Sequence, residues 1–300
     1  MPPPLFFSPE VADAIGRRQP LVALESTVIA HGLPRPHNLN LAQRMEAIVR
    51  ECGATPATIA ILNGQIKVGL TPDELNYLAN ADHVVKVSRR DFPIVATRKQ
   101  DGATTVAGTM IVAAWAGIKV FATGGIGGVH HGDATDISAD LPELSRTSVA
   151  VVCAGAKSIL DLPATLEWLE TAGVPVIGYQ TDEFPAFYSR SSGLKLEACA
   201  DDAKEAAQMI KTKWEMGLEG GVLIANPIPE TESLDRQKID KAIAKALSAA
   251  KTKGIRGKAV TPFLLSHLSK ATHGESLKAN IALLENNARV AAMIAGEMNR

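Results

Sequence analysis

The chain has 300 residues, of which 46% are hydrophobic and 4% aromatic, and its formal net charge is −1. It is long enough to bury a large core, but it lacks the basic excess of a nucleic-acid-binding protein and the aromatic side chains that stack bases. No apolar run reaches the roughly 18 residues of a membrane span and the first residues lack the basic region of a secretory signal, so we expect a cytoplasmic protein without a membrane partner.

Short apolar runs alternate with longer helical patterns along the chain. Strands are expected at Leu21–Ala30, Ala57–Leu62, His83–Val87, Ile118–Ala122, Ser148–Val152, Val174–Gly178 and Gly221–Ala225. Helices are expected at Asn40–Glu51, Asp73–Asn80, Thr104–Ala116, Ser158–Thr171, Asp202–Met216, Asp235–Thr252 and Ser276–Met298. Most of the strands are apolar throughout, which is typical of a sheet covered on both faces. The pattern predicts one α/β domain over residues 1–300, a three-layer α/β/α sandwich around a largely parallel or mixed central sheet.

The most informative segment follows the expected strand at Ile118–Ala122 and reads Thr123-Gly124-Gly125-Ile126-Gly127-Gly128-Val129-His130-His131. Its glycines allow a ligand to approach the backbone closely. The segment lacks the third glycine of a dinucleotide fingerprint, because His130 stands at that place, and no P-loop lysine follows a glycine. The sequence favours a catalytic loop near an anion or a metal over a plain glycine-rich turn.

Two ionisable residues stand in apolar surroundings. Glu25 lies within an expected strand, where a carboxyl group serves either acid/base chemistry or a buried structural contact. Lys157 follows the small residues Ala154-Gly155-Ala156, so its amine has room to reach a pocket and attack a carbonyl; the alternative is a lysine in the first turn of a surface helix. Cys153 is expected to be a buried, inert thiol, and the three dispersed cysteines indicate a reducing compartment.

Charged residues cluster at two further places. Lys86, Arg89 and Arg90 follow one another at a strand end, where they form either a phosphate site or a solvated basic turn. Asp136 and Asp140 offer hard oxygen ligands for Mg²⁺ or Mn²⁺, or are solvated loop acids. Three functions remain open on this chemistry. They are an imine-forming or acid/base enzyme acting on a phosphorylated carbonyl or sugar, a metal-assisted phosphatase or sugar-phosphate transferase, and a non-catalytic ligand-binding module.

Longer motifs add a resemblance. They are Ala23-Leu24-Glu25-Ser26-Thr27-Val28-Ile29-Ala30-His31-Gly32-Leu33-Pro34, the glycine segment up to His130, Asp136-Ile137-Ser138-Ala139-Asp140, Cys153-Ala154-Gly155-Ala156-Lys157-Ser158-Ile159-Leu160-Asp161, Asn226-Pro227-Ile228-Pro229 and Thr261-Pro262-Phe263-Leu264-Leu265. In this order, from about residue 8 to 298, the chain resembles the pseudouridine-5′-phosphate glycosidase family.

The resemblance implies reversible cleavage of pseudouridine 5′-phosphate to uracil and ribose 5-phosphate by a cytoplasmic homotrimer with one Mn²⁺ per subunit. The general acid of the family matches Glu25, its imine-forming lysine matches Lys157, and its metal carboxylate matches Asp136. Substrate contacts are implied for Lys86, Val106, Thr123, His130, Ser138, Ala139, Asp140 and Asn280. The loop at 131–135 is shorter than in the bacterial pattern of the family, which bears on the surroundings of the metal.

Overall fold

The structure is a computed structural model that describes residues 3–255 and 260–300. A mixed sheet of 11 strands forms its centre in the order β1-β4-β3-β2-β7-β10-β14-β12-β13, with β6 antiparallel to β3 and β5 parallel to β6. Its strands are β1 (Leu5–Phe7), β2 (Leu21–Glu25), β3 (Thr55–Leu62), β4 (Gln65–Val68), β5 (Val85–Val87), β6 (Gly102–Thr104), β7 (Val120–Ala122), β10 (Ala150–Cys153), β12 (Val176–Tyr179), β13 (Ala198–Ala200) and β14 (Val222–Ala225). From β3 through β2, β7, β10 and β14 to β12 all neighbours are parallel, so these strands end at one edge.

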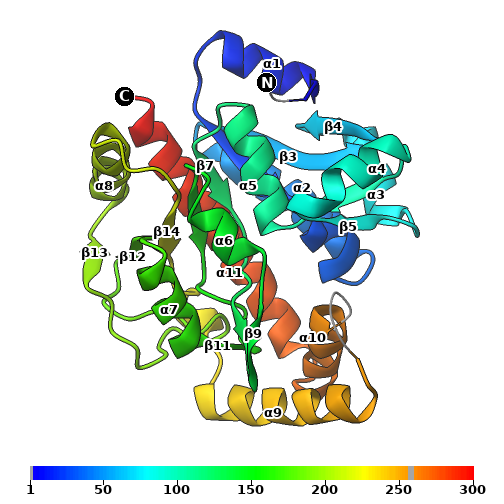
Figure 1. The fold of residues 1–300 in the computed structure, drawn as a ribbon, viewed down its shortest axis with the longest axis vertical. Helices are drawn as coiled ribbons and strands as arrows, with labels where there is room; N and C mark the ends of the chain where they lie inside the picture. The colour runs from blue at the N-terminus through cyan, green and yellow to red at the C-terminus, as the bar shows by residue number, and fades with distance from the viewer. Residues whose placement is uncertain (1–2, 256–259) are drawn as a thin grey trace.

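Helices cover both faces of the sheet (Figure 1). One face carries α2 (His37–Glu51), α8 (Ala203–Glu215) and α11 (Glu275–Met298), and the other carries α5 (Val106–Trp115) with α6 (Asp140–Leu144) beside it. Helix α11 crosses β2, β7 and β10, and the alanines on its buried face allow a close approach to the sheet. This three-layer arrangement confirms the fold class expected from the sequence.

The remaining elements surround this core. Helices α1 (Pro9–Gly16), α3 (Pro72–Asn80), α4 (Phe92–Thr97) and α7 (Leu162–Thr171) lie at its periphery. Helices α9 (Arg236–Thr252) and α10 (Val260–Ala271) pack on each other at one end of the molecule (Figure 1). A small antiparallel sheet joins β11 (Leu160–Asp161), β8 (Val129–His130) and β9 (Asp133–Ile137).

Two expected elements are wrong in length, and both errors fall at the functional end of the sheet. The strand expected to reach Ala30 ends at Glu25, and a single π-helical turn follows at Val28–Gly32. At the entry to this turn, Ser26 O accepts the N–H groups of both Ile29 and Ala30 at 3.0 Å. The helix expected from residue 158 begins at Leu162, where Asp161 Oδ1 caps it by accepting from Ala164 N at 3.0 Å. Helices α1, α4, α6 (Asp140–Leu144) and α10, and strands β1, β4, β6, β8, β9, β11 and β13, were not expected from the sequence.

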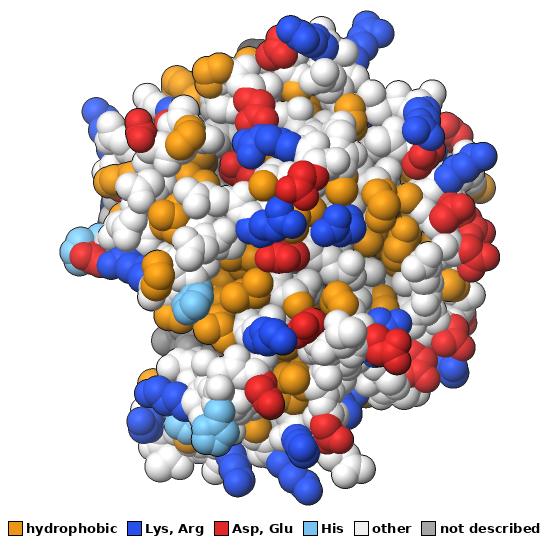
Figure 2. All heavy atoms as spheres, turned by 180° about the vertical axis from the view of Figure 1, so that it is seen from behind, with side chains coloured by type: hydrophobic (Ala, Val, Ile, Leu, Met, Phe, Trp, Pro, Cys, Tyr) orange, Lys and Arg blue, Asp and Glu red, His pale blue; other side chains and the backbone are white. Residues whose placement is uncertain are grey.

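The surface mixes charges of both signs. On the face opposite to the view of Figure 1, lysine and arginine side chains alternate with aspartate and glutamate (Figure 2). None of the described helices is long and apolar enough to cross a membrane.

Candidate active site

The carboxyl ends of the central strands open into a pocket with about 660 Å³ of empty space, part of which is open to solvent. After β2 the chain adds β3 on one side, and it later adds β7 and β10 on the other, so the strand order reverses between β2 and β7. Open α/β sheets bind their ligands at such a reversal. Four of the predicted site residues line this pocket, namely Glu25, Lys86, Lys157 and Asn280.

Glu25 is the last residue of β2, and its side chain is only 7% exposed. Its Oε1 accepts a hydrogen bond from the hydroxyl of Thr123, and its Oε2 accepts one from the hydroxyl of Thr27. These hydroxyl groups replace water around a carboxyl group that forms no ion pair among the described residues. Glu25 therefore lines the pocket as a carboxyl group held in place and able to exchange a proton.

The loop that carries Lys157 is paired with the glycine loop through the backbone. Ala154 N donates to Gly124 O at 2.9 Å, Ile126 N donates to Gly155 O at 3.1 Å, and Lys157 N donates to Ile126 O at 3.0 Å. Lys157 therefore lies in a loop that lines the pocket, five residues before α7 begins. The alternative of a lysine in the first turn of a surface helix is wrong.

Two glycines of the loop are required by close contacts. A Cβ atom on Gly125 would lie 2.7 Å from two ring carbons of Phe187 and 3.0 Å from Gly155 O. A Cβ atom on Gly127 would collide with the side chain of Ser138. The glycine loop is thus packed into its neighbours on both sides, as a site-forming segment and not as a solvated turn.

Asp140 fastens the glycine loop to a helix. Its Oδ1 accepts from Ala107 N at 2.9 Å in the first turn of α5, and its Oδ2 accepts from Gly127 N at 2.8 Å. Ser138 Oγ in turn accepts from Asp140 N at 3.3 Å. Val106 begins α5 and is buried, whereas Ala139 is exposed. These residues stand beside the pocket rather than in its wall, and the carboxylate of Asp140 holds two backbone segments together.

The basic cluster does not act as a unit. Lys86 on β5 lines the pocket. The guanidinium of Arg89 instead forms a two-pronged pair with the buried Glu143, at 2.8 Å and 2.6 Å, and Arg90 lies exposed with its Nε 3.9 Å from Asp91. The expectation that all three cations bind one phosphate is therefore wrong, because Glu143 holds Arg89 outside the pocket.

The predicted metal residue lies apart from the pocket wall. Asp136 is exposed on β9, and His130 on β8 pairs with Leu160 of β11. The described residues contain no group of three His, Cys, Asp or Glu side chains that could hold a metal ion. The residues present therefore do not form a protein cage, and an ion at Asp136 would take most of its ligands from water.

The pocket residues that were not predicted as functional include three with larger polar or aromatic side chains: Thr27, His31 and Phe187. Both Thr27 and His31 follow Glu25 within a few residues; Thr27 immediately precedes the π-helical turn, and His31 lies in it. The polar residues that interrupt the apolar strand pattern here were a signal for them. Phe187 had no such signal, because it comes from a loop far along the chain.

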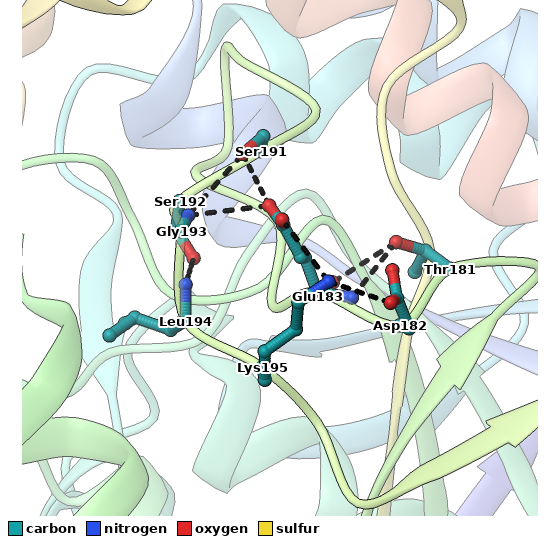
Figure 3. A network of polar contacts seen from close by, with 8 residues as sticks. All are labelled: Thr181, Asp182, Glu183, Ser191, Ser192, Gly193, Leu194 and Lys195. Atoms are coloured by element: carbon teal, nitrogen blue, oxygen red, sulfur yellow. Dashed lines mark hydrogen bonds and ion pairs between the residues drawn. The ribbon is translucent and has the colours of Figure 1, made fainter.

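Phe187 enters the site from an irregular loop that a polar network holds in shape (Figure 3). Glu183 accepts from the hydroxyl of Ser191 and from Gly193 N, the latter at 3.3 Å, and lies 3.6 Å from Lys195 Nζ. Phe187 itself adopts the left-handed region at a φ of 61° and donates its N–H to the Lys157 loop at 3.1 Å. A bulky residue in this conformation is unusual, and here it is held against the wall of the pocket.

Cys153 takes no part in the pocket. It is fully buried, and burial raises the pKa of its thiol to about 12, so it stays protonated at neutral pH. The expected buried position of this thiol is confirmed, and its lack of reactivity remains a prediction.

Comparisons with known proteins agree over the whole chain. The family described as indigoidine synthase A like protein matches residues 10–297. The pseudouridine-5′-phosphate glycosidases of Caldanaerobacter subterraneus subsp. tengcongensis and Geobacillus kaustophilus are each 59% identical to this chain and cover 98% of it, and the matches span 96% and 99% of those proteins. The crystal structure of the prealnumycin C-glycosynthase AlnA in complex with ribulose 5-phosphate is 41% identical with a TM-score of 0.91, over 100% of this chain and 98% of that one. The chain therefore belongs to the indigoidine synthase A like family, which includes these pseudouridine-5′-phosphate glycosidases.

Proposed function

We propose that this chain is a pseudouridine-5′-phosphate glycosidase, which reversibly cleaves the C-glycosidic bond of its substrate to give uracil and ribose 5-phosphate. The observation that carries the proposal is the meeting of Glu25 and Lys157 in one pocket at the reversal of strand order. The names of the relatives and the sugar phosphate bound to the related C-glycosynthase support it.

The bond to be broken explains why a lysine is useful. The C-glycosidic bond joins C1′ of the ribose to C5 of uracil, so no electronegative atom of the base can be protonated to let the base leave. A nitrogen bonded to C1′ provides an electron pair that expels the base. Lys157 supplies this nitrogen from a loop fixed by backbone hydrogen bonds.

The proposed reaction begins at C1′ of the substrate. The free amine of Lys157 attacks C1′ while the C1′–O4′ bond breaks, and Glu25 transfers the proton that O4′ needs. The nitrogen bonded to C1′ next loses a proton to the Glu25 carboxylate, and its lone pair forms a C1′=N bond as the C1′–C5 bond breaks, while C5 of uracil takes up a proton from the Glu25 carboxyl group. Water adds to the imine, releases ribose 5-phosphate as the aldehyde and restores the amine. Phe187 and the apolar wall limit the access of water until uracil has left.

The substrate phosphate needs a cation in the pocket. Lys86 lines the pocket and offers this cation, whereas Glu143 holds the guanidinium of Arg89 outside the pocket wall. The enzyme should consequently discriminate between pseudouridine and its 5′-phosphate. Equal kcat/KM values for the two compounds would refute a phosphate contact in this pocket.

We also propose that the active form is a homotrimer that binds one Mn²⁺ per subunit near Asp136. No step above is assigned to the ion. Elemental analysis after dialysis should find about one Mn²⁺ per chain in the wild type and much less in Asp136→Ala, and light scattering should give the trimer mass. If Asp136→Ala left the Mn²⁺ content unchanged, Asp136 would not be a ligand of the ion, and the ion would bind at another place.

The decisive experiment traps the covalent intermediate. Borohydride added with ribose 5-phosphate should increase the intact mass by that of the sugar phosphate less one oxygen, and the modified peptide should contain Lys157. Lys157→Ala and Lys157→Arg should both lose adduct and turnover, and Glu25→Ala should lose turnover. An adduct on another lysine, with Lys157→Ala still active, would exclude this mechanism. Release of inorganic phosphate without uracil would instead indicate a phosphatase, and no turnover a binding module.

A further inference from the structure

Behind the pocket, two buried asparagine side chains form a short hydrogen-bonded relay. Asn226 follows β14 and is 3% exposed, and Asn287 lies in α11 and is fully buried. Asn226 Nδ2 donates to Asn287 Oδ1 at 2.8 Å. Asn287 Nδ2 donates to Thr123 O at 2.8 Å, with Gly124 O at 3.5 Å. The relay thus ends on the first two residues of the glycine loop.

The direction of the relay follows from its partners. Thr123 and Gly124 present carbonyl oxygens, which only accept, so Asn287 must turn its NH₂ group toward them. Its carbonyl oxygen then faces Asn226, which must donate. Asn226 is itself fixed by its backbone, because its N–H donates to Cys153 O at 2.8 Å. The orientation of the Asn287 amide is therefore fixed from the far end.

The residue held by the relay directly contacts Glu25, the proposed proton-transfer group. Thr123 donates its hydroxyl to Glu25 Oε1, and its own N–H donates to Val152 O at 3.0 Å. Gly124 O also accepts from Ala154 N in the loop that carries Lys157. Asn287 thus ties α11 to the point where the segments carrying Glu25 and Lys157 meet.

We propose that Asn287 is a positioning residue for the reaction: it fixes the Thr123–Gly124 turn, and through that turn the placement of Glu25 relative to Lys157. Asn226 orients Asn287 and acts one step further away. The inference rests on the proposed roles of Glu25 and Lys157. Neither asparagine is part of the wall of that pocket, so both act without touching the substrate.

The position has a matched control on the same helix. Asn286 precedes Asn287, but it is only half-buried, and its Nδ2 donates to Pro227 O at 3.3 Å instead of to the glycine loop. Asn287→Leu and Asn286→Leu therefore make the same chemical change at neighbouring positions. Only the first change removes the donor to Thr123 O.

The experiment measures kcat, KM and the rate of imine formation for both variants. Asn287→Leu should lower kcat per folded molecule about tenfold to a hundredfold, as expected for a misplacement of reacting groups by up to about 1 Å. Its KM should stay within about threefold, and borohydride trapping with ribose 5-phosphate should slow by a similar factor to kcat. Asn286→Leu should keep both rates. A role in stability alone would lower the melting temperature and leave kcat per folded molecule unchanged, which would overturn the proposal.

Further variants keep the test decisive. If Asn287→Leu does not fold, Asn226→Leu removes the orienting donor while leaving Asn287 in place, and it should reduce kcat by a smaller factor with KM retained. An unchanged kcat in Asn226→Leu would then overturn the inference. Glu25→Gln and Lys157→Ala are measured in parallel. If those two remain active, the proposed function fails; if they are inactive while Asn287→Leu is fully active, only the inference fails.

Discussion

Replacing Asp140 by asparagine tests whether this carboxylate holds the glycine loop in place. Asp140 is buried, and its two oxygens accept from Ala107 N at 2.9 Å and from Gly127 N at 2.8 Å. Asparagine has nearly the same shape but a single acceptor. Its NH₂ group must therefore face one of the two backbone N–H groups, where neither can accept a hydrogen bond.

The magnitude follows from these contacts. A hydrogen bond to a charged group contributes about 1.5–3 kcal/mol, and a buried donor left without a partner costs about 1–3 kcal/mol. Since one bond is lost and the other persists without its charge, Asp140→Asn should lower the free energy of unfolding by about 2–4 kcal/mol. For a chain of this size that corresponds to a fall in melting temperature of about 4–8 °C.

Urea and thermal unfolding, followed by circular dichroism, measure this effect. Asp136→Asn serves as the control, because Asp136 lies exposed a few residues earlier in the same segment and its replacement should leave metal-free unfolding unchanged. Activity should fall in Asp140→Asn because the glycine loop, which begins at Thr123, loses its anchor on α5. An unfolding curve that matches the wild type would refute the anchoring role.

Three other predictions concern buried groups. The Cys153 thiol, whose pKa burial raises to about 12, should resist iodoacetamide at pH 8 in the folded enzyme while the two half-buried cysteines react; rapid labelling would refute the buried position. Burial also raises the pKa of Glu46, so the folded state binds its proton more tightly and the contribution of this group to stability is lost as pH rises through that pKa. Glu46→Gln should therefore gain stability relative to the wild type between pH 4 and 7 in urea titrations, and a constant difference would contradict this. Arg89→Met leaves the buried Glu143 without its ion-pair partner and should lower the free energy of unfolding by about 1–3 kcal/mol, with KM unchanged. A large rise in KM would instead show that Arg89 contributes to phosphate binding.

The sequence was sufficient to locate the edge of the sheet where the site lies. Glu25, Thr123 and Lys157 each follow an apolar run, and the ends of parallel strands meet at one edge. A polar residue at the end of a fully buried strand is thus a signal that a single sequence provides. The neighbouring π-helical turn was missed because Val28, Ile29 and Ala30 resume the apolar pattern after the polar residues that end the strand.

Other parts of the site could not be predicted because they depend on contacts between distant segments. Phe187 reaches the pocket from an irregular loop whose shape rests on polar contacts around Glu183 (Figure 3). Arg89 belonged by its position in the sequence to a phosphate cluster, but a carboxylate 54 residues later in the chain holds it elsewhere. The spacing of charged residues in the sequence indicates which of them could bind a phosphate. Which partner each charged side chain contacts depends on how the helices pack on the sheet.

The same distinction explains why positioning residues are harder to recognise than reacting ones. A reacting group needs a rare chemistry in an unfavourable setting, such as an amine or carboxylate next to an apolar strand, and this conflict is visible in the sequence. Asn287 has ordinary chemistry, and its residue type does not distinguish it from Asn286. Its importance arises only because α11 crosses the strand ends at a position where its amide meets the Thr123 carbonyl. The comparison of these two adjacent asparagines therefore separates the contribution of geometry from that of composition.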